Sequence, residues 1–380
     1  MIAVIADDFT GAAELAGICV RYHLRVELAT EVPHSTNANV FILATDCRSM
    51  KEEQAVAAMK MHTEALLALQ PSWLFKKTDS VLRGHILAEI AAQLTVTGYD
   101  KAVLVAANPA LGRTITDGLY FVYGQPVHET SFSHDPDFPV VSSSVKDMLR
   151  ADGYPVYLKK STDTLPDKGI IAGDVKTVDD LTRWAAQIDN ETLAAGASGF
   201  FEALLSRRAT AQSRDTLAAA ERDTVQNRST PVLFVCGTTF SNSRDAIQAI
   251  YVNGGPVSYM PEEIIDTVEW ADEVTALVRK HGKAIVAIHA GLTGNLADPH
   301  RLGLRMAALV KEVLQRNIIR ELIIEGGATS WAVIQESGLT QFFPVEELTP
   351  GVVRMQTVNA DLFLTVKPGS YNWPAGMWDF

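Results

Sequence analysis

Two adjacent carboxylates follow a short apolar run at the very start of the chain. Residues 2–5 are apolar and predict a buried strand, while Thr10 and apolar positions at helical spacing over 12–19 predict a helix that Thr10 caps. Asp7 and Asp8 fall on the turn between these two elements. In an open α/β sheet, ligands bind outside the carboxyl ends of the strands. We therefore expect both acids to face a ligand and to act in catalysis; simple helix capping is the alternative.

A second cluster of charged residues occupies positions 75–84 and reads Phe-Lys-Lys-Thr-Asp-Ser-Val-Leu-Arg-Gly. We expect Asp79 or Ser80 to cap the amphipathic helix that follows. Lys77 and Arg83 would then stand beside the positive end of that helix, where the first backbone N–H groups have no partners. This pattern predicts a receptor for a small anion such as a carboxylate. Surface ion pairs are the alternative interpretation for these cations and for Arg48, which follows another strand.

A long polar loop follows the apolar run 102–106. It begins at Ala107-Asn108-Pro109, where the proline ends regular strand pairing, and continues through Gly112-Arg113-Thr114 towards His128. Asn108, Arg113 and Thr114 could all form hydrogen bonds with a polyhydroxy acid. Long ordered loops of this kind are usually functional.

Strand-like and helical stretches alternate along both halves of the chain, which is typical of parallel sheets covered by helices. Residues 206–230 are polar and contain five arginines. The sequence therefore predicts an α/β protein of two domains, each a mainly parallel sheet flanked by helices, with the active site in the cleft between them. We expect a substrate-binding domain over 1–205, a connector over 206–230 and a nucleotide-binding domain over 231–380.

The second half contains two turns that could hold phosphate. The apolar run 322–324 leads into Glu325-Gly326-Gly327-Ala328-Thr329, where glycines would let the backbone approach a ligand at the start of a helix. Residues 237–243, Gly-Thr-Thr-Phe-Ser-Asn-Ser, follow another strand and offer hydroxyls. The chain has no Gly-x-x-x-x-Gly-Lys-Ser/Thr and no Gly-x-Gly-x-x-Gly motif, so the residues alone leave ordinary turn punctuation as an alternative.

Seven short motifs, taken in order, make the chain resemble the four-carbon acid sugar kinases over nearly its whole length. They are Ala6-Asp-Asp-Phe-Thr-Gly11, Thr45-Asp-Cys-Arg48, Lys77-Thr-Asp-Ser80 with Leu82-Arg-Gly84, Gly112-Arg-Thr114 with Asp117-Gly118, Pro126-Val-His-Glu-Thr130, Gly326-Gly327 with Thr329, and Lys367-Pro-Gly369. The resemblance implies an ATP-dependent kinase of a sugar acid such as threonate, erythronate or 3-oxo-tetronate.

The resemblance also implies roles for individual residues. The expected ATP contacts are Gly326, Gly327, Ala328, Thr329 and Gly369, with Ser241 or Ser243. Phosphoryl transfer needs alignment, charge neutralisation and a proton acceptor. We expect Asp8 to be the base, Asp7 to orient it or to help hold a magnesium-bound phosphate, and Asp79 to be the alternate base. The carboxylate of the substrate is assigned to Arg48, Lys77 and Arg83, and its hydroxyls to Asn108, Arg113 and Thr114. Mg²⁺ is expected with ATP, but its protein ligands are not assigned.

The chain departs from the usual family pattern at three places that bear on these roles. Glu14 stands where Asp is common, Glu325 precedes the Gly-Gly pair where Thr is frequent, and the segment from Lys367 continues through Tyr371 into Asn372-Trp-Pro374. We expect the chemistry to be kept. The identity of the acid and the nucleotide geometry near Gly369 are the features that these changes bear on.

Composition restricts the partners. The net charge of −12 opposes binding to nucleic acid and to anionic membranes, and no long uncharged apolar stretch predicts a membrane span. Three widely spaced cysteines are expected to be reduced core thiols, and a cytoplasmic protein, perhaps better stated as monomer or homodimer, is expected. Two other functions stay open: an NAD-dependent sugar-acid oxidoreductase, which the absence of Gly-x-Gly-x-x-Gly disfavours, and a non-catalytic sugar-acid binding protein.

Overall fold

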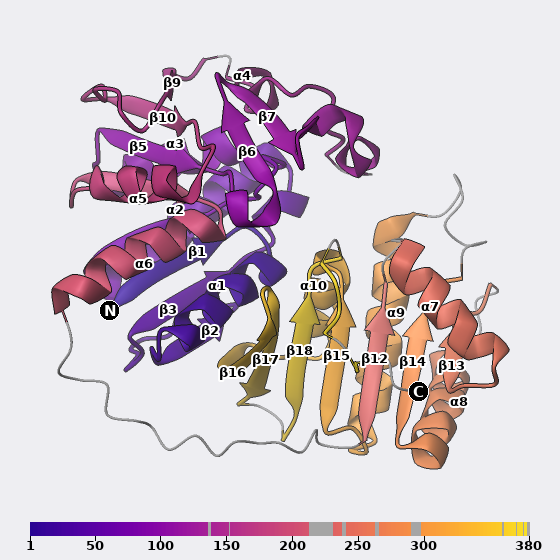
Figure 1. Cartoon of the computed structure of the whole chain (residues 1–380). Helices are drawn as coiled ribbons and strands as arrows, with labels where there is room; N and C mark the ends of the chain where they lie inside the picture. Colours follow the sequence, from indigo (N-terminus) through magenta and orange to yellow (C-terminus); the bar gives the residue numbers. More distant parts are fainter. Residues whose placement is uncertain are drawn as a thin grey trace.

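The protein folds into two lobes that share one continuous sheet, as the computed structural model in Figure 1 shows. The structure describes residues 1–135, 138–151, 153–212, 231–237, 241–262, 266–289, 298–358, 361–369, 371–374 and 376–377. Over these residues, fifteen strands pair in the order β13-β14-β12-β15-β18-β17-β16-β2-β3-β1-β4-β11-β5-β10-β9. The predicted α/β class, with two mainly parallel halves flanked by helices, is confirmed.

The N-terminal lobe contains eight parallel strands in the main sheet. They are β1 Ile2–Ala6, β2 Val26–Ala29, β3 Val40–Ala44, β4 Trp73–Lys77, β5 Lys101–Val105, β9 Val156–Lys159, β10 Gly169–Gly173 and β11 Thr192–Gly196. The helices of this lobe are α1 Phe9–Arg21, α2 Glu52–Ala68, α3 Ile86–Thr97, α4 Val145–Met148, α5 Val178–Ala186 and α6 Ser198–Gln212. A small antiparallel sheet is formed by β6 Arg113–Thr116, β7 Leu119–Val122 and β8 Gln125–Pro126.

The C-terminal lobe pairs five parallel strands and adds an antiparallel hairpin. Its elements are β12 Val232–Cys236, α7 Ser241–Val252, β13 Val257–Tyr259, α8 Thr267–His281, β14 Lys283–Ala287, α9 Pro299–Gln315, β15 Glu321–Glu325, α10 Gly327–Glu336, β16 Gln341–Thr349, β17 Val352–Thr357 and β18 Phe363–Lys367. The strands of both lobes are almost entirely buried apolar runs, as expected for parallel strands covered on both faces.

The two lobes meet where β16 pairs with β2 in antiparallel register. Helix α1 covers this joint: Phe9 packs edge to face on Phe342 of β16, with ring centroids 5.2 Å apart. Gly17 of α1 lies against β17, where a Cβ would come within 2.7 Å of Val353. The glycine therefore permits the close approach of helix and hairpin, and the carboxyl ends of the strands in the two lobes are brought towards each other.

Further sequence expectations can be compared with the structure. Helix α6 continues to Gln212, so the first residues of the expected 206–230 connector are helical, while 213–230 lie outside the described residues. Cys19, Cys47 and Cys236 are buried and unpaired, as predicted. Among the helices that the structure describes, none combines the length and the apolar character needed to cross a bilayer.

Candidate active site

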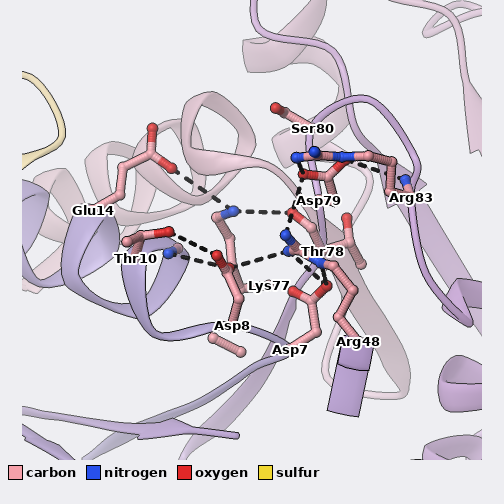
Figure 2. Close-up of polar contacts among 12 residues, drawn as sticks. Asp7, Asp8, Thr10, Glu14, Arg48, Lys77, Thr78, Asp79, Ser80 and Arg83 are labelled. Carbon is pink, nitrogen blue, oxygen red and sulfur yellow. Dashed lines mark hydrogen bonds and ion pairs between the residues drawn. The ribbon is translucent and has the colours of Figure 1, made fainter. Parts of the chain in front are cut away.

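Asp7 and Asp8 leave the end of β1 and share one cation. The Arg48 guanidinium donates from Nε and Nη2 to Oδ2 of Asp7, both at 2.8 Å, and its Nη2 lies 3.1 Å from Oδ1 of Asp8 (Figure 2). Arg48 lies in a short 3-10 turn, Cys47–Ser49, after the neighbouring strand β3. Because β1 and β3 are parallel, their carboxyl ends place these side chains at the same edge of the sheet.

Asp8, and not Thr10, is the N-cap of helix α1. Its Oδ1 accepts the N–H of Gly11 at 3.1 Å, while Thr10 donates its hydroxyl to Oδ2 at 2.7 Å. The expected capping by Thr10 is therefore wrong, because the helix begins one residue earlier at Phe9. Burial acts to raise the pKa of Asp8, but Arg48 and Lys77 together with the Thr10 hydroxyl hold it below its ordinary value. Asp8 is thus ionised at neutral pH.

Asp79 organises the loop after β4 instead of capping the next helix. Its carboxylate accepts the N–H groups of Val81 and Arg83, and Arg83 adds a two-point contact at 3.0 and 2.7 Å. Helix α3 starts only at Ile86, because the loop turns through left-handed conformations at Leu82 and Gly84. The expected capping by Asp79 or Ser80 is wrong for that reason. Burial opposes ionisation of Asp79, but the two arginines nearby hold its pKa well below the usual range.

The basic residues of this lobe are already largely paired with acids. Arg83 also donates to Asp135 at 2.6 Å, and Arg48 lies 3.7 Å from Asp79. Lys77 donates to the carbonyl of Thr78 and lies 3.7 Å from Oε2 of Glu14. The predicted anion receptor is therefore a mixed cluster of acids and bases in which a bound carboxylate would compete with internal partners.

Arg113 differs from the other cations of the cluster, because the described residues give it no carboxylate partner. It leaves β6, donates to the hydroxyl of Ser80, and stacks near Phe132 and Tyr371 with distances of 5.7 and 6.0 Å to the ring centroids. Thr114 follows it on the strand and so projects from the opposite face of the small sheet. The structure thus brings Arg113 to the cluster and directs Thr114 away from it.

Asn108 reaches the same cluster through a chain of hydrogen bonds. Its side chain donates to Ser198 at 3.1 Å, and Ser198 donates to Oε1 of Glu14 at 2.8 Å. Glu14 also accepts the hydroxyl of Tyr371 from the other lobe at 2.8 Å. Asn108 therefore supports the site from behind through Ser198 and Glu14.

The Gly-Gly turn of the second lobe lies at the end of β15, as the sequence predicts. Gly326 has φ +102°, a conformation that favours glycine, and helix α10 begins at Gly327 without a side-chain cap. The backbone N–H groups of its first turn are therefore available to an anion. Gly237 faces this turn so closely that a Cβ there would lie 2.0 Å from the hydroxyl oxygen of Thr329.

A buried ion pair supports the glycine turn from below. Glu325 and Lys367, both fully buried, are joined at 2.8 Å, and Ser243 donates to the same Glu325 oxygen at 2.7 Å. Trp373 donates its indole N–H to the other oxygen at 3.0 Å. Ser243 therefore acts here as a partner of Glu325, and Gly369 lies on the loop just after Lys367. The side chain of Ser241 lies outside the described residues.

The two halves of the site meet at Gly327. A Cβ placed on Gly327 would lie 3.3 Å from Oδ2 of Asp8 and 3.2 Å from the hydroxyl oxygen of Thr10. This contact joins the glycine turn of the C-terminal lobe to the acid turn of the N-terminal lobe. A phosphoryl group bound at the start of α10 would therefore stand directly beside the Asp8 carboxylate.

The site fits Mg²⁺ only as an ion carried largely by phosphate oxygens. Within the described residues no group of three or more Asp, Glu, His or Cys side chains is arranged to hold a metal. Mg²⁺ in kinases is commonly bound by one or two carboxylates together with substrate phosphates. Asp8 faces the glycine turn and could supply one such carboxylate, and the buried Oδ1 of Asp7 has no hydrogen-bond partner in the structure.

Several residues that complete the site were not assigned roles from the sequence. They are Thr10, Ser198, Lys367, Tyr371 and Trp373, with Glu14 and Glu325, which had been noted only as departures from a family pattern. Ser198 follows β11 and Lys367 ends β18, so a search of residues at strand ends would have found both. The remaining contacts join positions far apart in the chain, and no local pattern indicates them.

The fold and the geometry define a two-lobed α/β enzyme with an acid-lined turn facing a phosphate-binding turn, and comparisons with known proteins agree. Residues 2–204 match the sugar-binding N-terminal domain family, and residues 255–371 match the nucleotide-binding C-terminal domain family. Since the first match covers more than half of the chain, the protein belongs to this family, the four-carbon acid sugar kinases.

Characterised relatives align over nearly the whole chain. A D-threonate kinase of Salmonella typhimurium is 26% identical over 97% of this chain and 94% of its own length. A 3-oxo-tetronate kinase of Pectobacterium atrosepticum is 25% identical over 97% of this chain and 96% of its own length. A D-erythronate kinase of Heliobacterium modesticaldum is 30% identical over 47% of this chain and 41% of its own length.

Solved structures share the fold. A Salmonella typhimurium protein has a TM-score of 0.76 at 19% identity, covering 98% of this chain and 96% of its own. A Haemophilus influenzae protein has a TM-score of 0.70 at 20% identity, covering 97% of each chain. Both likenesses extend over the two lobes together, so the arrangement of the lobes belongs to the fold as a whole.

Proposed function

We propose that the protein is an ATP-dependent kinase that transfers the γ-phosphoryl group to a hydroxyl of a four-carbon sugar acid. The observation that carries this proposal is the contact between Gly327 at the start of α10 and the Asp8 carboxylate. Phosphoryl transfer requires a nucleophile and a phosphate to be held in line. An acid turn and a glycine turn that touch across two lobes provide the framework for that alignment.

The acid would bind in the N-terminal lobe. Arg113 and Lys77 are the strongest candidates to hold its carboxylate, because Arg113 has no acidic partner among the described residues and Lys77 is only 3.7 Å from one carboxylate. Arg48 and Arg83 are held by aspartates and would contribute positive charge with less freedom to move. Asn108 would act through Ser198 and Glu14.

Asp8 is the best-supported proton acceptor. Asp79 is held by Arg83 through two contacts and by two backbone N–H groups, so it has little capacity to accept a proton. Asp7 lies deeper, against Arg48. Asp8 alone of the three lies against the glycine turn. Its lowered pKa suits a loose transition state, in which the proton leaves the attacking hydroxyl late and a strong base is not required.

The nucleotide would lie on the C-terminal lobe. Gly326, Gly327, Ala328 and Thr329 offer free backbone N–H groups at the start of α10, where phosphate oxygens are favoured. Gly369 lies nearby on the loop after β18. Mg²⁺ would be bound mainly by the phosphates, with Asp8 or Asp7 as the protein carboxylate, and would neutralise phosphate charge. ATP as the phosphoryl donor also favours a cytoplasmic location.

A coupled assay of ADP release tests this proposal. The purified full chain is incubated with ATP, Mg²⁺ and, in turn, D-threonate, D-erythronate and 3-oxo-tetronate, with NAD⁺ reduction measured in parallel. We expect acid-dependent ADP release with at least one of them and no NAD⁺ reduction. NAD⁺ reduction would favour the oxidoreductase, and acid binding without either reaction would favour the non-catalytic binding protein.

The oligomeric state is a separate proposal. A Bordetella bronchiseptica protein of the same fold, with a TM-score of 0.50, crystallised with citrate as a domain-swapped dimer. We propose a homodimer for this chain as well. Light scattering coupled to size-exclusion chromatography would measure the molar mass, and a mass of one chain across the working concentration range would contradict it.

A further inference from the structure

The loop after β18 is fixed by one buried ammonium group. Lys367 donates to Glu325 at 2.8 Å and to the backbone carbonyls of Pro368, Gly369 and Tyr371 at 3.0, 3.3 and 2.6 Å. Lys367 itself is fully buried. The loop therefore wraps around this ammonium, and the position of Tyr371 is set by the same ion pair that supports the glycine turn.

Tyr371 reaches from the C-terminal lobe into the acid cluster of the N-terminal lobe. Its hydroxyl donates to Oε1 of Glu14 at 2.8 Å, and the guanidinium of Arg113 lies 6.0 Å from the centre of its ring. The ring packs on Gly351, where a Cβ would come within 2.4 Å of it. Tyr371 thus lies between two residues of the N-terminal lobe and is held on its far side by its own lobe.

Glu14 transmits this contact to the residues that face the substrate. Its Oε1 accepts from Ser198 as well as from Tyr371, while Oε2 lies 3.7 Å from the Lys77 ammonium, as Figure 2 shows for Glu14 and Lys77. With Oε1 occupied by two donors, the carboxylate is oriented and Oε2 is directed at Lys77. Loss of the Tyr371 hydroxyl would let Glu14 rotate and pair more closely with Lys77.

The Tyr371 hydroxyl stays a donor across neutral pH. Burial, and then the negative charge of Glu14, raise the pKa of Tyr371 above its ordinary value. The contact is therefore a charge-assisted hydrogen bond from a protonated phenol to a carboxylate, a kind that is stronger than a neutral one.

On the basis of the proposed kinase function, we propose that Tyr371 is a positioning residue for the sugar acid. Through Glu14 and Arg113 it keeps Lys77 and Arg113 available to the carboxylate of the substrate. The nucleotide lobe thereby supplies a residue to the acid site, and the loop that carries Gly369 shapes both halves of the reaction centre.

Tyr371→Phe tests this inference, because it removes one oxygen and keeps the ring on Gly351. Kinetics are measured with ATP and whichever of the three acids of the panel the wild type phosphorylates best. Since a hydrogen bond to a charged group is worth up to about one to two tenfold steps in affinity, we expect the KM for the acid to rise about tenfold. The KM for ATP and the kcat should change by less than about threefold on the same scale.

Two further variants separate positioning from a general loss of structure. Tyr157→Phe removes a phenol hydroxyl from the edge strand β9, where the residue is 42% exposed, and should leave every kinetic constant unchanged. If Tyr371 acts through Glu14, adding Tyr371→Phe to Glu14→Gln should raise the KM for the acid by much less than it does in the wild type.

The outcomes are distinct for the two proposals. A rise of less than about threefold in the acid KM of Tyr371→Phe, an equal rise in the ATP KM, or full additivity with Glu14→Gln would overturn the role of Tyr371. A wild-type protein that releases no ADP with any acid of the panel would instead overturn the kinase function itself.

Discussion

Asp8 combines three tasks that the sequence suggests only separately. It caps helix α1 through the Gly11 N–H, it pairs with Arg48, and it faces the glycine turn at Gly327. The capping interpretation and the catalytic interpretation are therefore compatible, because one carboxylate oxygen points into the helix and the other towards the opposite lobe. This position distinguishes Asp8 from Asp7 and Asp79, whose oxygens are directed at arginines.

Asp8→Asn tests the proposed proton acceptor. The amide keeps the size and the ability to cap α1 but cannot take the proton of the attacking hydroxyl, so we expect kcat to fall by at least about 100-fold. Binding of ATP, measured by calorimetry, should change little. Asp117→Asn is the matched control, because Asp117 is an exposed acid at a turn of the small sheet and should leave kcat unchanged. Near-normal turnover in Asp8→Asn would remove Asp8 from this role.

Asp46 gives a prediction about pH. It lies beside the acid cluster, and burial raises its pKa to about 6, with Ser49 donating to it at 2.9 Å. Because the pKa in the folded protein exceeds the ordinary value, the folded state is favoured at low pH and loses that advantage as pH rises from about 4 to 6. Asp46→Asn removes this loss. Thermal melts should show the variant more stable than wild type at pH 8, with the gap closing at pH 4.

The reverse pattern would contradict this account of Asp46. If Asp46→Asn were less stable than wild type at pH 8, the ionised carboxylate would have to be making a favourable contact that outweighs its burial. The comparison at two pH values is therefore decisive without any measurement of activity.

At the scale of the elements, the glycine turn is the feature that local sequence predicts best. The strand, the two glycines and the following helix are contiguous, so their order alone places Gly326 and Gly327 at a helix start. The helix after β4 was harder to place, because Leu82 and Gly84 adopt left-handed conformations that no hydrophobic period reports. The internal pairing of Arg83 with Asp79 and Asp135 follows from that loop.

Gly327→Ala tests the contact between the two turns. The backbone of Gly327 tolerates a side chain, but the added methyl would press on Asp8 and Thr10 at 3.3 and 3.2 Å. Because small misplacements at a reacting centre are costly, we expect kcat/KM for ATP to fall by at least about tenfold. Circular dichroism and thermal melts should show an intact fold, since alanine is the better helix former.

Gly303→Ala provides the control for Gly327→Ala. Gly303 lies within α9, and a Cβ there would have no neighbour within 4 Å. Its kinetics should match those of wild type, and its stability should rise by about 0.5–1 kcal/mol. If Gly327→Ala behaved like Gly303→Ala, the two turns would not meet in the working enzyme.

At the scale of the whole molecule, the two lobes form one sheet through a joint that local patterns could not predict. The β16–β17 hairpin carries polar residues and register shifts, and its pairing with β2 joins positions more than 300 residues apart in the chain. The same distance in sequence separates Tyr371 from Glu14. Such contacts depend on the complete fold, whereas the acid and glycine turns depend on their neighbours in sequence.

Phe342→Ala tests this joint. Phe342 is fully buried, pairs with Leu28 across the junction and packs on Phe9, so the cavity should cost about 3–5 kcal/mol. Because the lost contacts link the lobes, calorimetry should resolve two unfolding transitions where wild type shows greater overlap. Phe75→Ala is the control: Phe75 is equally buried within the N-terminal lobe, and its loss should lower stability without separating the lobes. Identical melting profiles for the two variants would contradict a structural role for the joint.

The most direct test of the central proposal is a crystal structure of the protein with a non-hydrolysable ATP analogue, Mg²⁺ and the best acid of the panel. The account predicts the terminal phosphate at the N–H groups of the Gly326–Gly327 turn, with the carboxylate of the acid near Arg113 and Lys77 and one of its hydroxyls between Asp8 and that phosphate. A triphosphate bound away from the glycine turn, or an acid whose hydroxyls all point away from Asp8, would contradict it.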